Sequence, residues 1–316
     1  MDRPSPYQIL DTALELSVAG SFSRLGVRAR RAAGGWTDPP RMDGKKVLIT
    51  GASSGIGAAA AEAMGRLGAS LWLVGRDRAR LEQVSAATSG HPVVADIVEG
   101  AQLERLVSSV KEQAGRLDGL VHNAGALFPR YRRSPDGLEL TVATHVVAPF
   151  RLTEMLRPLL ADPSVIVTVS SGGMYTEALD LGGLEMGPDG YRGAVAYARA
   201  KRAQVVLAHE WARRLGPSGV ASHAMHPGWV RTPGVAAGLP RFSRLGPLLR
   251  TPAEGADTLV WLVSSTLSDP AFPREGFWLD RRPRGEHYLP STRRGADGEE
   301  LWRWCEAAAA RSGAAQ

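Results

Sequence analysis

Residues 46–68 read KVLITGASSGIGAAAAEAMGRLG, in which an apolar run, a glycine-rich turn and a helical pattern follow one another directly. Gly51, Gly55 and Gly57 permit a tight turn and let backbone N–H groups come close to an anion. The N-terminus of the helix adds a favourable dipole and free donors for a pyrophosphate. A glycine-rich turn alone is weak evidence, but its position between a strand and a helix predicts a dinucleotide-binding site.

The rest of the main segment continues this alternation of apolar runs and helical patterns. Because the apolar runs lack polar alternation, we expect strands that are covered on both faces. The sequence therefore predicts an α/β fold with a Rossmann-like, doubly wound parallel sheet in a single domain. The expected strands are 46–50, 70–75, 91–96, 117–123, 164–171, 220–228 and 275–280.

Further segments flank this domain on both sides. Residues 6–31 have an apolar-leaning helical pattern that ends in several arginines, and a linker is expected at 34–44. The helix could pack on its own domain or on a partner, or make peripheral contact with an anionic membrane surface. We expect an N-terminal helical extension and linker (1–43), a dinucleotide-binding catalytic domain (44–290) and a C-terminal helix and tail (291–316).

Composition bears on whether the protein binds nucleic acid or metal ions and on its cellular compartment. Lys and Arg total 38 against 32 Asp and Glu, but the basic residues are spread along the chain, so nucleic-acid binding is not expected. Cys305, the single cysteine, lies in a helix expected at 298–310 and cannot form an internal disulfide. The seven histidines are scattered, so no metal site is expected. The lack of a signal peptide and of an apolar run of about 20 residues predicts a cytoplasmic protein.

The end of the strand expected at 70–75 should lie near the adenosine ribose of a dinucleotide. Enzymes that select NAD commonly place an acidic side chain there, whereas this chain has Gly75 and then Arg76. Arg76 could bind the 2′-phosphate of NADP through a charged fork. Alternatively, it is a solvated loop arginine that pairs with Asp77, with Asp96 or with no residue. The sequence favours NADP(H), with NAD(H) as the alternative.

Residues 195–201, VAYARAK, place a tyrosine four positions before a lysine. On a helix, Tyr197 and Lys201 would share one face, so that the ammonium could act on the phenol. A phenol has an ordinary pKa of about 10, and an adjacent ammonium favours the phenolate and lowers that pKa. We therefore expect Lys201 to tune Tyr197 for proton exchange.

Taken in order, these motifs resemble those of the short-chain dehydrogenase/reductases. Within that family the chain looks like the dehydrogenase/reductase family member 12-type proteins, through VSSGGMY, KRAQVVL, MHPGW, TPGV, GADTLVWL, the N-terminal helix and FWLDRRP. The ordered set, rather than any one motif, makes the resemblance specific. The family motifs are TGASSGIG at 50–57, VADI at 94–97, HNAG at 122–125, VSS at 169–171, YARAK at 197–201 and HPGWVRT at 226–232.

The resemblance implies an oxidoreductase that interconverts a carbonyl and an alcohol by hydride transfer with a nicotinamide cofactor. Tyr197 would exchange a proton with the substrate oxygen, and Ser171 would hold that oxygen by a hydrogen bond. Lys201 would also bind the nicotinamide ribose. In the family, the second serine of the pair forms the hydrogen bond to the substrate oxygen, which is why Ser171 is assigned here. Ser170 is the alternative for that hydrogen bond.

The resemblance also assigns cofactor-binding positions, from adenine at Asp96 to the nicotinamide amide at Thr232. Some have simpler interpretations: Gly125 as a turn, Asp96 as a strand cap and Thr232 as the N-cap of a helix that begins at Pro233. The full predicted set is Gly51, Ser53, Ser54, Gly55, Ile56, Gly57, Arg76, Asp96, Ile97, Asn123, Ala124, Gly125, Tyr197, Lys201, Pro227, Gly228, Val230 and Thr232.

One position departs from the family pattern. Residues 136–150, DGLELTVATHVVAPF, align with a helix whose asparagine helps to hold a water in the proton relay, and His145 stands at that position. A histidine can carry a proton and hold water, which makes His145 a candidate catalytic residue. It could equally pack in a helix interface.

The segment between the candidate serine and tyrosine should wall a substrate pocket, and 233–250 takes the place of the family's substrate lid. A segment that serves a partner or a membrane is the alternative for 233–250. An apolar wall is expected from Met174, Tyr175, Leu179, Leu181, Leu184, Met186 and Trp229.

We therefore expect an NADP(H)-preferring oxidoreductase with a lipophilic small-molecule substrate. The rival hypothesis is a non-catalytic NAD(P)-binding scaffold or sensor. A homo-oligomer is implied by the family resemblance alone.

Overall fold

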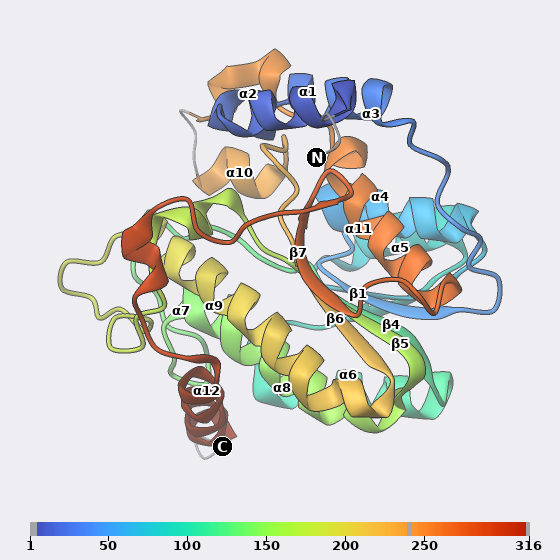
Figure 1. Cartoon of the computed structure of the whole chain (residues 1–316). Coiled ribbons are helices and arrows are strands. Elements are labelled where there is room, and N and C mark those ends of the chain that lie inside the picture. The colour runs from blue at the N-terminus through green and yellow to red at the C-terminus, as the bar shows by residue number, and fades with distance from the viewer. Residues whose placement is uncertain (1–4, 239–241, 314–316) are drawn as a thin grey trace.

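The computed structural model describes residues 5–238 and 242–313, and the predicted α/β fold with a doubly wound sheet is confirmed (Figure 1). The strand order is β3-β2-β1-β4-β5-β6-β7-β8, and each neighbouring pair is parallel except β7 with β8. The strands are β1 (Lys46–Thr50), β2 (Ser70–Gly75), β3 (His91–Val94), β4 (Leu117–His122), β5 (Leu160–Val169), β6 (Val220–Met225), β7 (Glu275–Leu279) and β8 (Arg282–Pro283).

Most differences from the predicted strand bounds lie at the carboxyl ends. β3, β4, β5, β6 and β7 each end before the predicted boundary. After β3, β4, β5 and β6, the motif residues that follow leave the sheet as loops. β5 begins at Leu160, four residues before its predicted start. The antiparallel strand β8 was not predicted, since two residues are too few to form a hydropathy pattern.

Helices cover both faces of the sheet (Figure 1). One face is packed by α4 (Gly55–Arg66), α5 (Arg78–Thr88) and α11 (Pro252–Ser268). The other face is packed by α6 (Gly100–Ala114), α7 (Leu140–Val142), α8 (Ala148–Leu156), α9 (Gly193–Leu215) and α12 (Gly298–Gly313). Shorter turns are the π-helical η1 (Ala143–Val147) and the 3-10 helices η2 (Arg157–Leu159), η3 (Gly172–Thr176), η4 (Gly216–Ser218), η5 (Phe242–Leu248) and η6 (Pro290–Arg293).

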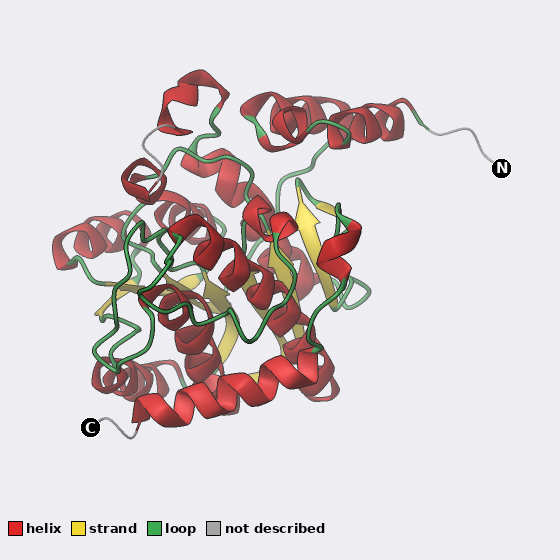
Figure 2. Ribbon diagram, turned by 90° about the vertical axis from the view of Figure 1, so that its left-hand side faces the viewer, coloured by secondary structure: helices red, strands yellow, loops and turns green. Residues whose placement is uncertain are grey.

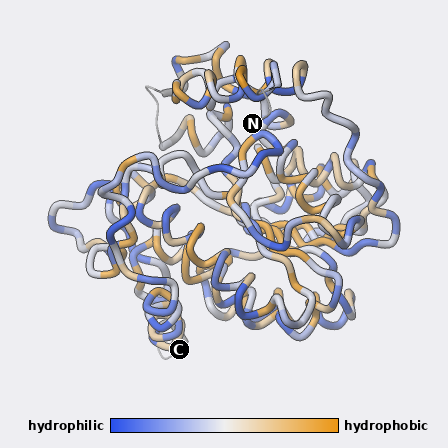
Figure 3. Tube along the Cα trace, viewed as in Figure 1, coloured by the Kyte–Doolittle hydropathy of each residue, from blue (hydrophilic) through white to orange (hydrophobic). Residues whose placement is uncertain are grey.

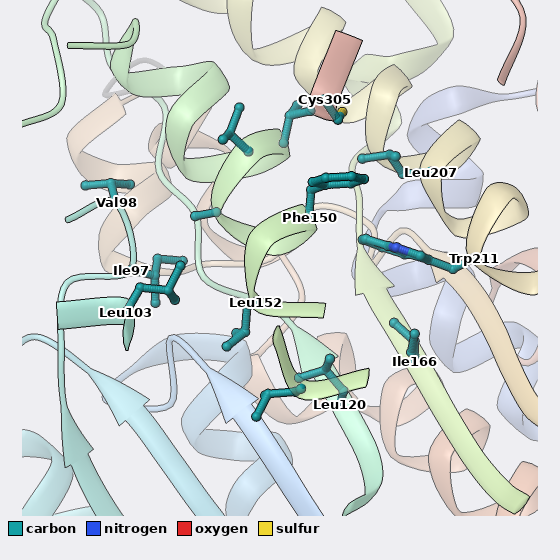
Figure 4. Packing of buried hydrophobic residues seen from close by; sticks show 14 of the residues in the cluster. Ile97, Val98, Leu103, Leu120, Phe150, Leu152, Ile166, Leu207, Trp211 and Cys305 are labelled. Atoms are coloured by element: carbon teal, nitrogen blue, oxygen red, sulfur yellow. The ribbon is translucent and has the colours of Figure 1, made fainter. Parts of the chain in front are cut away.

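The core is divided by the sheet into two layers. Successive strand residues point to opposite faces, so Val47 and Ile49 belong to one hydrophobic cluster and Leu48 to the other. Apolar chain is accordingly concentrated at the centre of the molecule (Figure 3). Figure 4 shows one layer, with Cys305 of α12 near Phe150. Burial raises the pKa of the Cys305 thiol, which is consistent with a packing role.

The N-terminal extension forms three helices rather than the single predicted helix: α1 (Pro6–Glu15), α2 (Val18–Phe22) and α3 (Arg24–Gly34). The breaks have a local cause, because Ser17 and Ser23 adopt extended conformations and stand at the N-caps of α2 and α3. The three helices lie across one end of the molecule (Figures 1 and 2). There, α3 contacts η5.

The segment after β7 fastens this extension to the sheet. The carboxylate of Asp280 binds both Arg30 of α3 and Arg250, and all three side chains are at most 1% exposed. Arg284 forms an ion pair with Asp11 of α1 at 2.8 Å. The extension is therefore packed on its own domain by buried charges as well as by apolar contacts.

Four large apolar side chains of the extension nevertheless face solvent: Ile9, Leu16, Val18 and Leu25. Across residues 5–238 and 242–313, no helix combines the length and the hydropathy that a membrane crossing requires.

Candidate active site

A cavity of about 570 Å³ lies at the carboxyl edge of the sheet. β1 and β4 are neighbours, but the chain turns away from them in opposite directions, so a crevice forms where their loops separate. Every predicted site residue except Gly57 lines this cavity. The lining residues of the predicted set are Gly51, Ser53, Ser54, Gly55, Ile56, Arg76, Asp96, Ile97, Asn123, Ala124, Gly125, His145, Ser171, Tyr197, Lys201, Pro227, Gly228, Val230 and Thr232.

The glycine-rich turn is tied to the end of β4. Gly51 and Gly55 have φ angles of 68° and 58°, in the left-handed region that favours glycine. The Asn123 amide donates to the carbonyls of Thr50 and Gly51 at 3.0 and 3.1 Å, and the Thr50 hydroxyl accepts the Asn123 N–H at 3.0 Å. Gly57 lies behind the turn, where a side chain would collide with the Gly51 carbonyl. Thr50 was not predicted as a site residue, although it is the first residue of the TGASSGIG motif.

The start of α4 fits a pyrophosphate. Its N-cap, Ser54, makes no side-chain hydrogen bond to the helix, so that side chain does not occupy the first N–H groups. Those donors lie beside two glycines that line the cavity. A free helix N-terminus with close backbone approach is an anion-binding arrangement.

Arg76 lies at the exposed end of the cavity. Its side chain is 72% exposed, and Nη1 lies 3.5 Å from Oδ2 of Asp96. The ion pair proposed as the alternative interpretation of Arg76 is therefore present. Such an exposed pair is weak, so it leaves the guanidinium available to a stronger anion.

The two serines after β5 differ in their surroundings. The hydroxyl of Ser170 is buried and donates to the carbonyl of Lys201 at 2.9 Å. Ser171 is partly exposed, accepts the N–H of Gly173 and forms a hydrogen bond with the phenol of Tyr197. Ser170 thus joins two elements, while Ser171 presents its hydroxyl beside Tyr197.

Tyr197 and Lys201 lie on α9 with the predicted spacing, and Nζ of Lys201 lies 5.4 Å from the centroid of the Tyr197 ring. Burial raises the pKa of Tyr197 above its ordinary value, and the Ser171 hydrogen bond only partly opposes this. The ammonium of Lys201 binds the carbonyl of Val169 at 2.9 Å and Gln204 Oε1 at 2.8 Å. Burial also lowers the pKa of Lys201 to about 7, so its amine is only partly protonated near neutral pH.

His145 comes from the π-helical turn η1 and meets Tyr197 edge-on, with ring centroids 5.3 Å apart. Its Nε2 lies 2.9 Å from the carbonyl of Ala126, which assigns the proton to Nε2. Nδ1 has no hydrogen-bond partner among the described residues. Burial, and then the charge of Lys201, lower the pKa of His145 well below 6.5, so the ring is neutral at neutral pH.

The loop after β6 lines another part of the cavity. Gly228 has a φ of 75°, and Val230 pairs with Arg250 in an isolated β-bridge. The Thr232 hydroxyl accepts the N–H of Val235 at 3.2 Å, at the start of α10 (Pro233–Gly238). Thr232 therefore acts as the N-cap that its simpler interpretation suggested, while it also lines the cavity.

The predicted apolar wall is largely wrong. η3 turns Met174 and Tyr175 into a hydrophobic cluster, and of the seven expected wall residues Trp229 alone lines the cavity. Leu127 and Phe128, which follow HNAG after Ala126, supply apolar lining instead. Their position in the loop after β4, just beyond a predicted cofactor motif, was the signal that could have identified them. From the predicted lid, residues 233–235 line the cavity, and residues 239–241 lie outside the described residues.

The fold and the cavity define an α/β protein with a dinucleotide site at the switch point of its sheet. A family model described as short chain dehydrogenase matches residues 45–239. The chain belongs to this family and is an oxidoreductase, and the family binds NAD(P) cofactors.

Several curated relatives are similar over most of their length. The chain is 35% identical to the human dehydrogenase/reductase SDR family member 12, covering 82% of this chain and 84% of that protein. It is 37% identical to a putative daunorubicin C-13 ketoreductase of Streptomyces sp. (strain C5), over 76% and 85% of the two chains. It is 34% identical to mouse retinol dehydrogenase 14, over 76% and 79%.

Solved structures share the fold. A protein from Mycobacterium paratuberculosis has a TM-score of 0.67 at 26% identity, covering 89% of this chain and 97% of that one. A Burkholderia cenocepacia short chain dehydrogenase in complex with NADP has a TM-score of 0.59 at 26% identity, over 75% and 96%. A 3-ketoacyl-(acyl-carrier-protein) reductase of Brucella melitensis complexed with NADH has a TM-score of 0.58 at 25% identity, over 73% and 93%.

The buried ammonium of Lys201 should make stability depend on pH. Folding lowers the pKa of Lys201 from 10.5 to about 7, so between these values the unfolded chain holds a proton that the folded chain has lost. The cost of burying the charge is complete below pH 7 and disappears as the pH rises toward 10.5. Lys201→Met should therefore raise Tm more at pH 6 than at pH 9, measured by differential scanning calorimetry.

The matched control is Lys111→Met, at an exposed position on α6. It should shift Tm by the same amount at both pH values. A Lys201→Met shift that does not change between pH 6 and pH 9 would contradict the lowered pKa.

Proposed function

We propose that this protein is an NADP(H)-preferring oxidoreductase that interconverts a lipophilic carbonyl compound and its alcohol. Ser171, Tyr197 and Lys201 would form its catalytic site. The observation that carries the proposal is one continuous cavity, which joins the glycine-rich turn to these three side chains. A dinucleotide seated on the turn could thus extend to the reacting oxygen without leaving the cavity.

The residues divide the chemistry as follows. A nicotinamide cofactor, when bound, supplies or accepts the hydride. Tyr197 donates a proton to the carbonyl oxygen during reduction and takes it back during oxidation. Ser171, already hydrogen-bonded to that phenol, orients the same oxygen. Lys201 lies in the same cavity and would bind the ribose hydroxyls.

His145 is proposed to take part in the proton relay. Its neutral ring packs against Tyr197, and its Nδ1 is an acceptor that has no hydrogen-bond partner among the described residues. A neutral imidazole with one free acceptor can hold a water or pass a proton. The packing alternative is also supported, because His145 is fully buried.

The NADP(H) preference rests on Arg76. An exposed guanidinium at the end of β2, opposed by one weak ion pair, would gain strong charged hydrogen bonds from a 2′-phosphate. NAD(H) lacks that phosphate and would gain little.

A lipophilic substrate is supported by the apolar side chains near the catalytic end. Leu127, Phe128, Trp229 and Val235 line the cavity. Two of the similar proteins are named as a putative daunorubicin C-13 ketoreductase and a retinol dehydrogenase, which is consistent with a large organic carbonyl or alcohol as substrate.

Three further proposals concern location and partners. The exposed Ile9, Leu16 and Leu25 support peripheral contact of the extension with an anionic membrane, which sedimentation with anionic liposomes would measure.

The proposal of a homo-oligomer rests on family analogy, and analytical ultracentrifugation would test it. A cytoplasmic location rests on the sequence and is measured by cell fractionation.

Tyr197→Phe separates the enzyme from the rival scaffold. It should lower kcat/KM for a lipophilic ketone by about 1,000-fold, because it removes the proton donor, while the NADPH dissociation constant stays within about threefold. NADPH absorbance with a panel of lipophilic aldehydes and ketones measures turnover, and calorimetric titration measures binding. Tyr191→Phe, outside the cavity lining, is the control and should keep parental activity. A parent chain that binds NADPH but reduces no panel member would favour the scaffold.

Arg76→Ala tests the cofactor preference. It should weaken NADPH binding about 10- to 100-fold and leave NADH binding within about twofold, because charged hydrogen bonds to the 2′-phosphate are lost. Calorimetric titration with each cofactor measures both effects. Arg78→Ala is a matched control, since that arginine is 73% exposed and pairs with Glu82 in the next turn. Equal losses for both cofactors would contradict the assigned role.

A further inference from the structure

The N-terminal extension reaches the catalytic site through one aromatic side chain. Phe22, the last residue of α2, is buried and meets the ring of His226 edge-on at 4.2 Å between centroids. It also meets Trp229 edge-on at 6.2 Å. Phe22 thus packs beneath the loop after β6, which lines the cavity.

Phe22 also packs against the residue that follows Ser171. A Cβ added at Gly172 would lie 2.6 Å from the Phe22 ring, which real side chains do not tolerate. Glycine at this position therefore lets the ring approach the backbone directly beside Ser171. The position of this turn depends on where the ring lies.

The main chain of the extension completes the contact. The carbonyl of Phe22 accepts the N–H of Trp229 at 2.8 Å and the Nε of Arg250 at 3.0 Å. Arg250 in turn donates to the carbonyls of Ser21 at 2.8 Å and Pro227 at 3.3 Å. One buried guanidinium therefore joins the extension to the cavity-lining loop, and Asp280 neutralises it.

These fastening residues lie outside the part of the chain that the family model matches, residues 45–239. The extension precedes that segment, while Arg250 and Asp280 follow it. The contacts are thus made by segments on both sides of the matched residues, and they converge on the loops after β5 and β6.

We propose that the N-terminal extension is part of the active site's support, with Phe22 as a positioning residue. It holds the Pro227–Val230 loop and the Ser171–Gly172 turn in the arrangement that the nicotinamide half of the cofactor and the substrate oxygen require. The proposal rests on the proposed function for its kinetic consequences. The adenosine half of the site, at the turn after β1 and at Arg76, does not contact Phe22 and is independent of it.

The test is Phe22→Ala in the full chain. Because only the nicotinamide half is disturbed, NADPH should bind about tenfold more weakly and kcat should fall about tenfold or more. Binding of 2′,5′-ADP, which carries only the adenosine half, should change by less than about twofold. Hydrogen exchange measured by mass spectrometry should increase in peptides that cover 171–175 and 226–231.

Two variants separate positioning from general loss of stability. Phe150→Ala removes an equally buried phenylalanine that packs on Trp302, away from the cavity lining, and should leave NADPH affinity and kcat near parental values. Phe22→Leu keeps apolar bulk and should restore most of the kcat and the NADPH affinity.

The inference is overturned if Phe22→Ala keeps parental NADPH affinity, kcat and exchange. It is also overturned if Phe150→Ala loses NADPH affinity and kcat to the same extent, or if 2′,5′-ADP binding weakens in parallel with NADPH binding. A parent chain that binds no NADPH would instead refute the proposed function. In that case hydrogen exchange at 226–231 still tests the positioning role. An increase in Phe22→Ala alone supports that role, whereas an equal increase in Phe22→Ala and Phe150→Ala contradicts it.

Discussion

The structure depends on one carboxylate that is shared by two buried guanidiniums. Asp280, Arg30 and Arg250 are at most 1% exposed, so each buried charge needs a partner of opposite sign. Asp280 supplies that partner for both guanidiniums, and Arg30 also pairs with Asp11 and Glu15. Asp280 has a φ of 52°, which a non-glycine residue adopts only when its surroundings fix it. The cluster sets the relative position of the segments that it joins more than it raises the net stability, because the desolvation of its charges offsets much of their attraction. It fixes where the extension, the end of β7 and the loop after β6 meet.

The backbone topology of the sheet, rather than any one side chain, forms the cavity. Parallel strands bring their carboxyl ends to one edge, and the reversal of direction between β1 and β4 leaves a space there. Thr50 and Asn123 then fix the glycine-rich turn to the end of β4 by short hydrogen bonds. Loops that are far apart in the sequence thus face one volume, and the chain supplies it with donors at one end and with hydroxyl groups at the other.

The end of the cavity that holds Tyr197, Lys201 and His145, the proposed catalytic end, disfavours charged forms of these side chains. Burial lowers the pKa of Lys201 and of His145 and raises that of Tyr197, so all three groups favour their neutral forms more than they would in water. An interior of this kind strengthens interactions with a charge that develops during reaction, which is a common use of buried ionisable groups. The exposed pair Arg76 and Asp96 at the other end carries no such cost, and it can rearrange around a phosphate.

The sequence by itself determined the fold class, the turn after β1, the spacing of Tyr197 and Lys201 and about half of the residues that line the cavity. These features follow from short-range patterns: strand hydropathy, glycine at positive φ and the repeat of one helix. Only the tertiary structure decided that α3 is joined to the domain through the ion pair of Arg30 with Asp280, that Met174 and Tyr175 belong to a hydrophobic cluster outside the cavity lining, and that the pKa of Tyr197 is raised. Each of these depends on contacts between distant segments, such as Arg30 with Asp280, 250 positions apart, and on burial that no local pattern encodes.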